Sequence, residues 1–124
     1  MNLVDSSAWL EYFADGPNAS FFATPIQKSR ELIVPTVVIF EVYKRVLQQR
    51  NVRAALEAVA VLRQGRIIDL TATLAIAAAT LSRSQKLPMA DSIILATARA
   101  ENAIIWTQDK DFERITGVKF RARR

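Results

Sequence analysis

The side chains in this sequence that could do chemistry are carboxylates. Asp5, Glu41, Asp91 and Asp109 each stand next to a strongly apolar stretch of the chain. The chain contains no cysteine and no histidine, which excludes disulfides, thiolate metal sites and histidine-dependent catalysis. Carboxylates are therefore the available metal ligands, and oxygen ligands favour Mg²⁺ or Mn²⁺ over zinc.

Taken singly, each acid has an ordinary structural explanation. Asp5 could simply cap a helix, because aspartate is among the preferred N-cap residues. Asp91 lies in the first turn of a predicted helix, where the helix dipole favours a negative charge. Asp109 and Asp111 follow a predicted strand and could be turn or cap residues, and Glu41 could be a surface glutamate.

The elements that would position these acids alternate between strand and helix. Short apolar runs predict strands at residues 1–5, 31–34, 66–70 and 103–107, with an edge strand at 118–120. Helices are predicted over 6–13, 18–30, 37–50, 52–64, 71–86 and 91–101. Pro25 falls inside the second helix and could break it, whereas Pro35 or Thr36 is expected to begin the third. The apolar first half of that third helix predicts burial on most sides.

This alternation predicts one α/β domain over residues 1–124. Its central sheet should be mostly parallel, with four to five strands and with helices on both faces. A parallel sheet would bring the strand-end acids to a single edge. Two charges 4 Å apart repel by about 4 kcal/mol at an effective dielectric of 20, so the cluster would need a cation. A metal ion there could polarise a phosphoryl oxygen and generate hydroxide from water.

The overall charge is compatible with a polyanionic substrate. Lysine and arginine number 17 against 12 acids, which gives a net charge of +5. Ordinary solubility explains such a surface equally well, so charge alone does not establish nucleic-acid binding. The chain opens with no signal-peptide pattern and has no apolar stretch of membrane-spanning length. We therefore expect a cytoplasmic protein that does not bind membranes.

Four segments together resemble the PIN-domain ribonucleases. They are Leu3-Val4-Asp5-Ser6-Ser7, Glu41 after Val34-Pro35-Thr36, the segment Leu87-Pro88-Met89-Ala90-Asp91-Ser92-Ile93-Ile94-Leu95-Ala96-Thr97-Ala98, and Trp106-Thr107-Gln108-Asp109-Lys110-Asp111-Phe112. The length of the chain is similar to that of the VapC toxins of prokaryotic toxin–antitoxin pairs. The resemblance covers essentially the whole chain and implies a PIN-like three-layer fold.

The resemblance also implies an activity and a set of residues. The chain would be a Mg²⁺-dependent endoribonuclease whose acidic pocket contains Asp5, Glu41, Asp91 and Asp109, with Asp5, Asp91 and Asp109 as metal ligands. Asp109 and Asp111 compete for the fourth acidic position, and Asp109 is favoured because it is nearer the strand end. Two hydroxyl side chains would orient carboxylates or water, those of Thr107 and Ser6.

The same resemblance implies partners. Family members are typically homodimers that a cognate antitoxin protein keeps inactive, and their RNA substrates are often tRNA or ribosomal RNA. Basic residues could contact the phosphates, namely Lys86, Lys110, Arg114 and the tail from Lys119, although for any single one a solvated surface position explains the sequence as well.

Two other function classes fit parts of the sequence. A receiver-like signalling domain of similar size would accept a phosphoryl group on Asp69, at the end of the third predicted strand. Such domains usually have two adjacent acids after the first strand, and here only Asp5 is present. A non-catalytic module that binds RNA or a protein partner is the other alternative, and the intact set of acids argues against it.

Overall fold

The computed structural model describes residues 1–124 and contains a five-stranded parallel sheet. Its strands are β1 (Asn2–Val4), β2 (Leu32–Pro35), β3 (Arg66–Ile68), β4 (Ile104–Thr107) and β5 (Val118–Phe120), arranged in the order β3-β2-β1-β4-β5. The central strand is β1, in which Leu3 pairs with Ile33 on one side and with Ile105 on the other. The predicted parallel sheet is confirmed, and β5 is an edge strand as expected.

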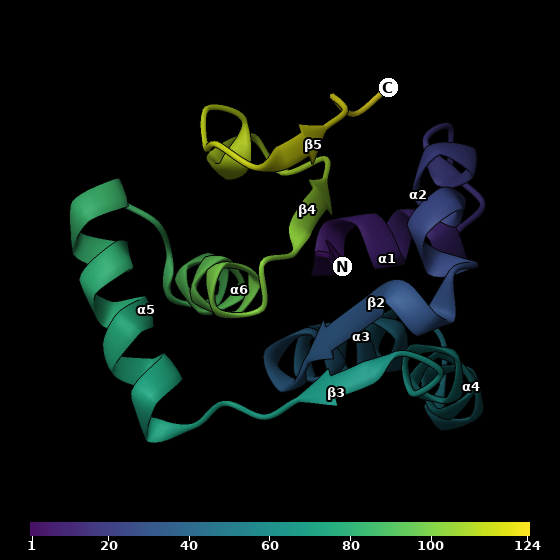
Figure 1. Cartoon of the computed structure of the whole chain (residues 1–124). Helices are drawn as coiled ribbons and strands as arrows, with labels where there is room; N and C mark the ends of the chain where they lie inside the picture. Colours follow the sequence, from purple (N-terminus) through teal and green to yellow (C-terminus); the bar gives the residue numbers. More distant parts are fainter.

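Six α-helices complete a three-layer fold. They are α1 (Ser6–Phe13), α2 (Ala19–Ile26), α3 (Thr36–Gln49), α4 (Val52–Leu62), α5 (Ala72–Gln85) and α6 (Met89–Ala100), joined by the 3₁₀ turns η1 (Ser29–Glu31) and η2 (Lys110–Phe112). In Figure 1, α5 and α6 lie on one side of β4, and α1 and α2 lie on the other. The prediction of helices on both faces is confirmed.

The order of the strands creates a crevice beside β1. The chain progresses outward from β1 through β2 to β3 and then returns through α5 and α6 to β4, on the opposite side of β1. In open parallel sheets, connections that leave neighbouring strands toward opposite faces open a binding crevice at the carboxyl ends of those strands. Asp5 directly follows β1, and Gln108 and Asp109 directly follow β4.

A main hydrophobic core and a smaller cluster fix these elements. The main core contains 22 buried residues, with the largest contributions from Trp9, Phe22 and Phe112. The smaller cluster joins α5 to α6 through Ala78, Ile93 and Ala96. Helix α6 is the most deeply enclosed helix, since every residue from Ser92 to Ala98 is buried. The first turn of α6 carries Asp91, so the core packing of this helix holds that carboxylate in place.

Two of the helix predictions need correction. The helix expected over 18–30 ends at Ile26, one residue after Pro25, and the chain then forms η1. A proline lacks the N–H for the helical ladder, which accounts for the early end. The first half of α3 is less completely buried than expected. Val38 and Val42 are buried, Val37 and Ile39 are partly buried and pack against the core, but Phe40 is 62% exposed.

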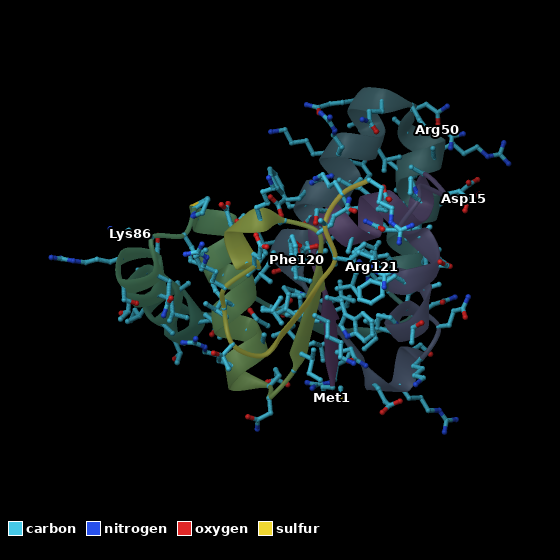
Figure 2. All side chains as sticks on the ribbon, turned by 90° about the horizontal axis from the view of Figure 1, so that it is seen from above. Met1, Asp15, Arg50, Lys86, Phe120 and Arg121 are labelled. Carbon is cyan, nitrogen blue, oxygen red and sulfur yellow. The ribbon has the colours of Figure 1, made fainter.

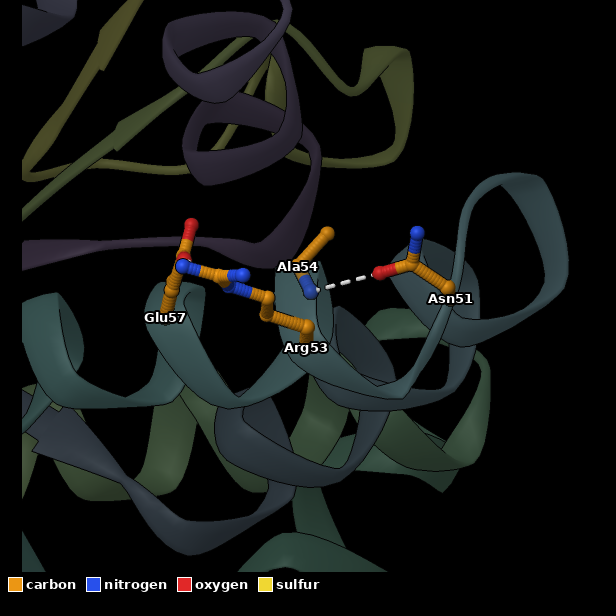
Figure 3. A network of polar contacts seen from close by, with 4 residues as sticks. All are labelled: Asn51, Arg53, Ala54 and Glu57. Carbon is orange, nitrogen blue, oxygen red and sulfur yellow. Dashed lines mark hydrogen bonds and ion pairs between the residues drawn. The ribbon is translucent and has the colours of Figure 1, made fainter.

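Helix α4 begins at a well-defined cap on the surface. The Asn51 side chain accepts a hydrogen bond from the Ala54 backbone N–H at 2.8 Å, as Figure 3 shows. One turn further, Arg53 Nε lies 3.3 Å from Glu57 Oε1 in an exposed ion pair. Such an exposed pair contributes little to stability. No helix of the fold combines the length and the apolar character needed to cross a membrane.

Candidate metal centre at the carboxyl edge of the sheet

Asp5 is buried at the junction between β1 and α1, with only 2% of its surface exposed. Its Oδ1 accepts hydrogen bonds from the Ala8 backbone N–H at 2.9 Å and from Ser7 Oγ at 2.8 Å, and its Oδ2 accepts one from Thr107 Oγ1 at 2.5 Å. Burial raises the pKa of Asp5 to about 6, and these three hydrogen bonds oppose the rise without cancelling it. Asp5 is therefore both the cap of α1 and a member of the site.

Thr107 connects the ends of β1 and β4. Its hydroxyl group donates to Asp5 and accepts a hydrogen bond from the Asp109 backbone N–H at 2.9 Å. The Asp109 side chain in turn accepts from the Asp111 N–H at 2.9 Å and caps η2. A continuous chain of hydrogen bonds thus links Asp5 to the segment that carries Asp109 and Asp111.

Asp91 faces the same segment from the first turn of α6. Its carboxylate oxygen lies within 4.8 Å of those of Asp109 and Asp111, and these oxygens are equally close to each other. The pKa of Asp91 is raised to about 8, mainly by loss of solvent and then by the charge of Asp109, with hydrogen bonding to Asp111 as a further cause. Without a cation, Asp91 retains a proton that an isolated carboxyl group would have lost.

Glu41 reaches the site from α3. Ser6 Oγ donates a hydrogen bond to Glu41 Oε1 at 2.5 Å, which joins the first turn of α1 to the middle of α3. A charge-assisted hydrogen bond of this length holds the glutamate in one orientation. The role expected for Ser6, orienting a carboxylate, agrees with this contact.

A pocket of about 490 Å³ lies over these residues. It is lined by Asp5, Ser6, Ser7, Leu10, Glu11, Ala14, Glu41, Arg45, Gln49, Asp91, Ile94, Gln108, Asp109 and Arg123. All four acids predicted for the acidic pocket line it. Asp111 does not line the pocket, but its carboxylate belongs to the tight group with Asp91 and Asp109. In contrast, the group does not include Asp5, which lies close enough to raise the pKa of Asp91.

Two arginines also line the pocket, Arg45 and Arg123. Arg45 is not among the predicted residues, whereas Arg123 belongs to the basic tail from Lys119 that is predicted to contact phosphates. Arg45 could have been found, because it follows Glu41 by four residues and positions four apart share one face of a helix. Nothing in the local sequence indicates that Arg123 would come to the pocket.

The residues present fit a small divalent cation. The donors are all carboxylate oxygens, the type that Mg²⁺ and Mn²⁺ prefer, and opposite ligands of one Mg²⁺ ion lie about 4 Å apart. The spacing of Asp91, Asp109 and Asp111 is compatible with that separation. A divalent ion would also stabilise the ionised forms of these acids and so lower the raised pKa of Asp91.

Asp69 occupies a different position from the acids of the pocket. It follows β3, an edge strand separated from β1 by β2, and it is exposed. No acid of the pocket lies on or directly after this strand. The arrangement therefore does not favour the receiver-like alternative.

Solved structures that are similar to this chain include ones described as a toxin–antitoxin complex and as a toxin. A chain described as a toxin–antitoxin complex from Klebsiella pneumoniae is similar with a TM-score of 0.81 and 22% identity, covering 96% of both chains. VapC20 of Mycobacterium tuberculosis, described as a sarcin-ricin loop cleaving toxin, is similar with a TM-score of 0.80 and 21% identity, covering 95% of this chain and 97% of that one. VapBC2 of Rickettsia felis, bound to a promoter DNA fragment, gives a TM-score of 0.74 and 16% identity, with 98% and 97% covered.

The sequence itself also identifies a family. No curated protein matches the chain significantly. The family model described as PIN domain matches residues 3–118, which include every acid of the pocket. The resemblance found in the four sequence segments is thereby confirmed, and the chain belongs to the PIN domain family.

Proposed function

We propose that this protein is a Mg²⁺-dependent endoribonuclease, with Mn²⁺ as an alternative ion. The observation that carries the proposal is the convergence of carboxylates from distant segments on one pocket. Asp5, Asp91 and Asp109 come from the end of β1, the start of α6 and the end of β4. Membership of a family of nucleases and a net charge of +5 support RNA as the substrate.

The roles of the individual residues follow from their contacts. Asp91, Asp109 and Asp111, whose carboxylate oxygens lie within 4.8 Å of one another, would hold the ion. Asp5, a ligand according to the family resemblance, lies outside this group, and the hydrogen bond from Thr107 fixes it beside the group. The bound ion would polarise the phosphoryl oxygen and supply hydroxide at neutral pH. Glu41, which Ser6 holds in one orientation, offers a carboxylate that can accept a proton from the attacking water.

We further propose that the enzyme is the toxin of a toxin–antitoxin pair, with tRNA or ribosomal RNA as its target. The descriptions of the similar structures support this proposal, as they name a toxin–antitoxin complex and a sarcin-ricin loop cleaving toxin. An apolar groove of about 330 Å³ between α1, α3 and α4 could take an apolar segment of the antitoxin. Exposed apolar side chains on other faces, Phe40, Ile76 and Met89, support a homodimer.

Cleavage of purified tRNA and ribosomal RNA tests the nuclease proposal. The wild-type protein should cut RNA with Mg²⁺ or Mn²⁺ and lose that activity in excess chelator. Asp91→Asn, purified in parallel, should lower the rate at least about 100-fold, because it removes one metal ligand and a metal supplies several kcal/mol of transition-state stabilisation. Asp69→Asn should cleave like wild type, which excludes a contaminating nuclease as the source of the difference.

A non-catalytic module gives a different result in the same assay. It would bind RNA without cutting it at any divalent ion concentration, and Asp91→Asn would leave binding unchanged or improve it. Cleavage that persists in excess chelator would contradict the metal-dependent mechanism directly.

A further inference from the structure

Two unpaired arginines stand in the wall of the acidic pocket. Arg45 comes from α3 and Arg123 from the segment after β5, and both are exposed. Neither lies within 4.0 Å of a carboxylate oxygen, since the ion pairs of the structure are Arg53–Glu57 and Arg66–Glu101. Both guanidinium groups are therefore free to bind an anion that enters the pocket.

The segment that carries Arg123 is fixed to the edge of the sheet. The Arg121 backbone N–H donates to the Thr107 carbonyl at 3.0 Å, and the Arg121 guanidinium group stacks over the Phe21 ring at 4.3 Å. In Figure 2, Arg121 lies over the middle of the molecule next to Phe120, while Lys86 projects far from it at the margin. Lys86 is thus a poor candidate for contacts near the pocket.

Asn18 provides a buried anchor for the same segment. Its side chain is fully buried, and its Nδ2 donates both to the Ala122 carbonyl at 2.9 Å and to Gln108 Oε1 at 3.1 Å. Gln108 itself lines the pocket next to Asp109. The residue before Arg123 is therefore tied to the β4 end of the site, and the tie limits how far Arg123 can move.

The negative charge of the pocket repels the phosphates of any nucleic acid that enters it. Five acids line it, Asp5, Glu11, Glu41, Asp91 and Asp109, against two arginines. A bound divalent ion would offset part of this charge at the cleaved phosphate, but it would not neutralise the repulsion of the neighbouring phosphates. Arginine binds phosphate through two parallel hydrogen bonds and stays charged at all relevant pH values.

We propose that Arg45 and Arg123 are positioning residues that bind the phosphates on either side of the bond to be cut. This inference rests on the proposed nuclease function and assigns to the pocket a binding site for the RNA backbone. An autoinhibitory role for Arg123 would place its guanidinium group against the carboxylates, and it forms no such ion pair. Together, Arg45 from α3 and Arg123 from the segment after β5 would hold the RNA backbone at the acids.

RNA binding at several salt concentrations tests the proposal independently of cleavage. A 20-nucleotide single-stranded RNA is titrated in metal-free buffer, so that no cutting occurs. Each lost phosphate contact should lower the slope of log affinity against log salt by about 0.7, and Arg45→Ala and Arg123→Ala should each weaken binding about tenfold. Arg123→Lys should keep the slope, because the charge remains, while recovering only part of the affinity.

Two control variants distinguish the effect of losing an arginine of the pocket from the effect of losing one positive charge anywhere on the protein. Arg124→Ala alters the residue next to Arg123, and Arg53→Ala removes a cation on α4, where Arg53 pairs with Glu57. Both should leave the slope as in wild type. In cleavage assays with Mg²⁺, Arg45→Ala and Arg123→Ala should raise KM more than they lower kcat, since ground-state binding is lost.

The outcomes distinguish this inference from the proposed function. If wild type binds with the predicted slopes but never cleaves, the nuclease proposal fails and the phosphate site stands. If wild type cleaves while Arg45→Ala and Arg123→Ala match Arg124→Ala in slope and KM, the inference is wrong. Faster cleavage by Arg123→Ala would show autoinhibition and overturn it, as would a wild-type protein that does not bind the RNA.

Discussion

The two halves of the carboxyl edge of the sheet use their polar residues in different ways. One half, here called the inner half, contains β1 and β4. There, the side chains of Asp5 and Thr107 are buried and hydrogen-bonded to each other. The other half, here called the outer half because it ends at the edge strand β3, contains β2 and β3. There, Thr36 accepts a hydrogen bond from the Leu70 backbone N–H at 3.3 Å, and Asp69 is exposed. The inner half forms a site, whereas the bond of the outer half only joins the start of α3 to the segment after β3.

The difference between the halves shows where along the edge of a parallel sheet a functional site can form. Every parallel strand delivers residues to the same edge, but the neighbouring connections leave toward opposite faces only where the strand order reverses, between β1 and β4. The space opened there is a pocket lined mostly by polar side chains. An acid at the end of a strand is therefore a site candidate mainly when that strand borders the reversal.

The largest expected difference between the halves concerns stability and pH in metal-free protein. The pKa of Asp5 is 3.8 in the unfolded chain and about 6 in the folded one. Between these values the folded state binds more protons than the unfolded state, so stability falls as pH rises. This difference of roughly 2 pH units corresponds to about 3 kcal/mol from Asp5. The loss from Asp91 continues to about pH 8.

Chemical denaturation with chelator at pH 5 and pH 8 measures this effect. Asp91→Asn should reduce the loss of stability between the two pH values, because it removes one of the groups that titrate. Asp69→Asn serves as the matched control from the outer half and should retain the full loss. Equal stability of wild type at both pH values would contradict the raised pKa values.

A smaller effect is expected when the hydrogen bond between the inner strands is removed. Thr107→Val keeps the shape of the side chain but leaves the Asp5 Oδ2 and the Asp109 N–H without their shared partner. Losing partners for buried polar groups costs about 1–3 kcal/mol, measurable by denaturation at pH 7. Thr36→Val, which breaks the exposed bond of the outer half, should cost clearly less. Similar costs for the two variants would remove the distinction between the halves.

The smallest effects concern the link between α1 and α3. Ser6→Ala removes the hydrogen bond to Glu41, so the glutamate should lose its fixed orientation and RNA cleavage should slow by about tenfold. Glu41→Gln should slow it at least as much. If Ser6→Ala slowed cleavage while Glu41→Gln did not, the serine would act through another group.

Much of the inner half could be predicted because its elements are local in sequence. The buried strand before Asp5, the helix that begins near Asp91 and the strand before Asp109 each follow from short apolar patterns, and parallel pairing then brings their ends together. The sequence offers a structural and a functional explanation of Asp5, and its contacts are compatible with both. Its Oδ1 caps α1 while its Oδ2 faces Thr107.

The features that could not be predicted depend on contacts between distant residues. Asn18 and Ala122 are 104 positions apart, and their hydrogen bond fixes the segment of Arg123. No local sequence pattern predicts a hydrogen bond between residues so far apart in the chain. Similarly, α5 and α6 are both rich in alanine, yet α5 buries only Ala78 while α6 buries seven consecutive residues. The difference in burial between the two helices comes from how they pack in the fold and not from their composition.

The central claim is that acids from distant segments hold one divalent ion, and calorimetric titration with Mn²⁺ tests it most directly. Wild type and the outer-half control Asp69→Asn should bind the ion with the same affinity. Asp91→Asn and Asp109→Asn should each bind it at least about tenfold more weakly, because each removes a ligand from the group. Unchanged Mn²⁺ affinity in Asp91→Asn would contradict the claim.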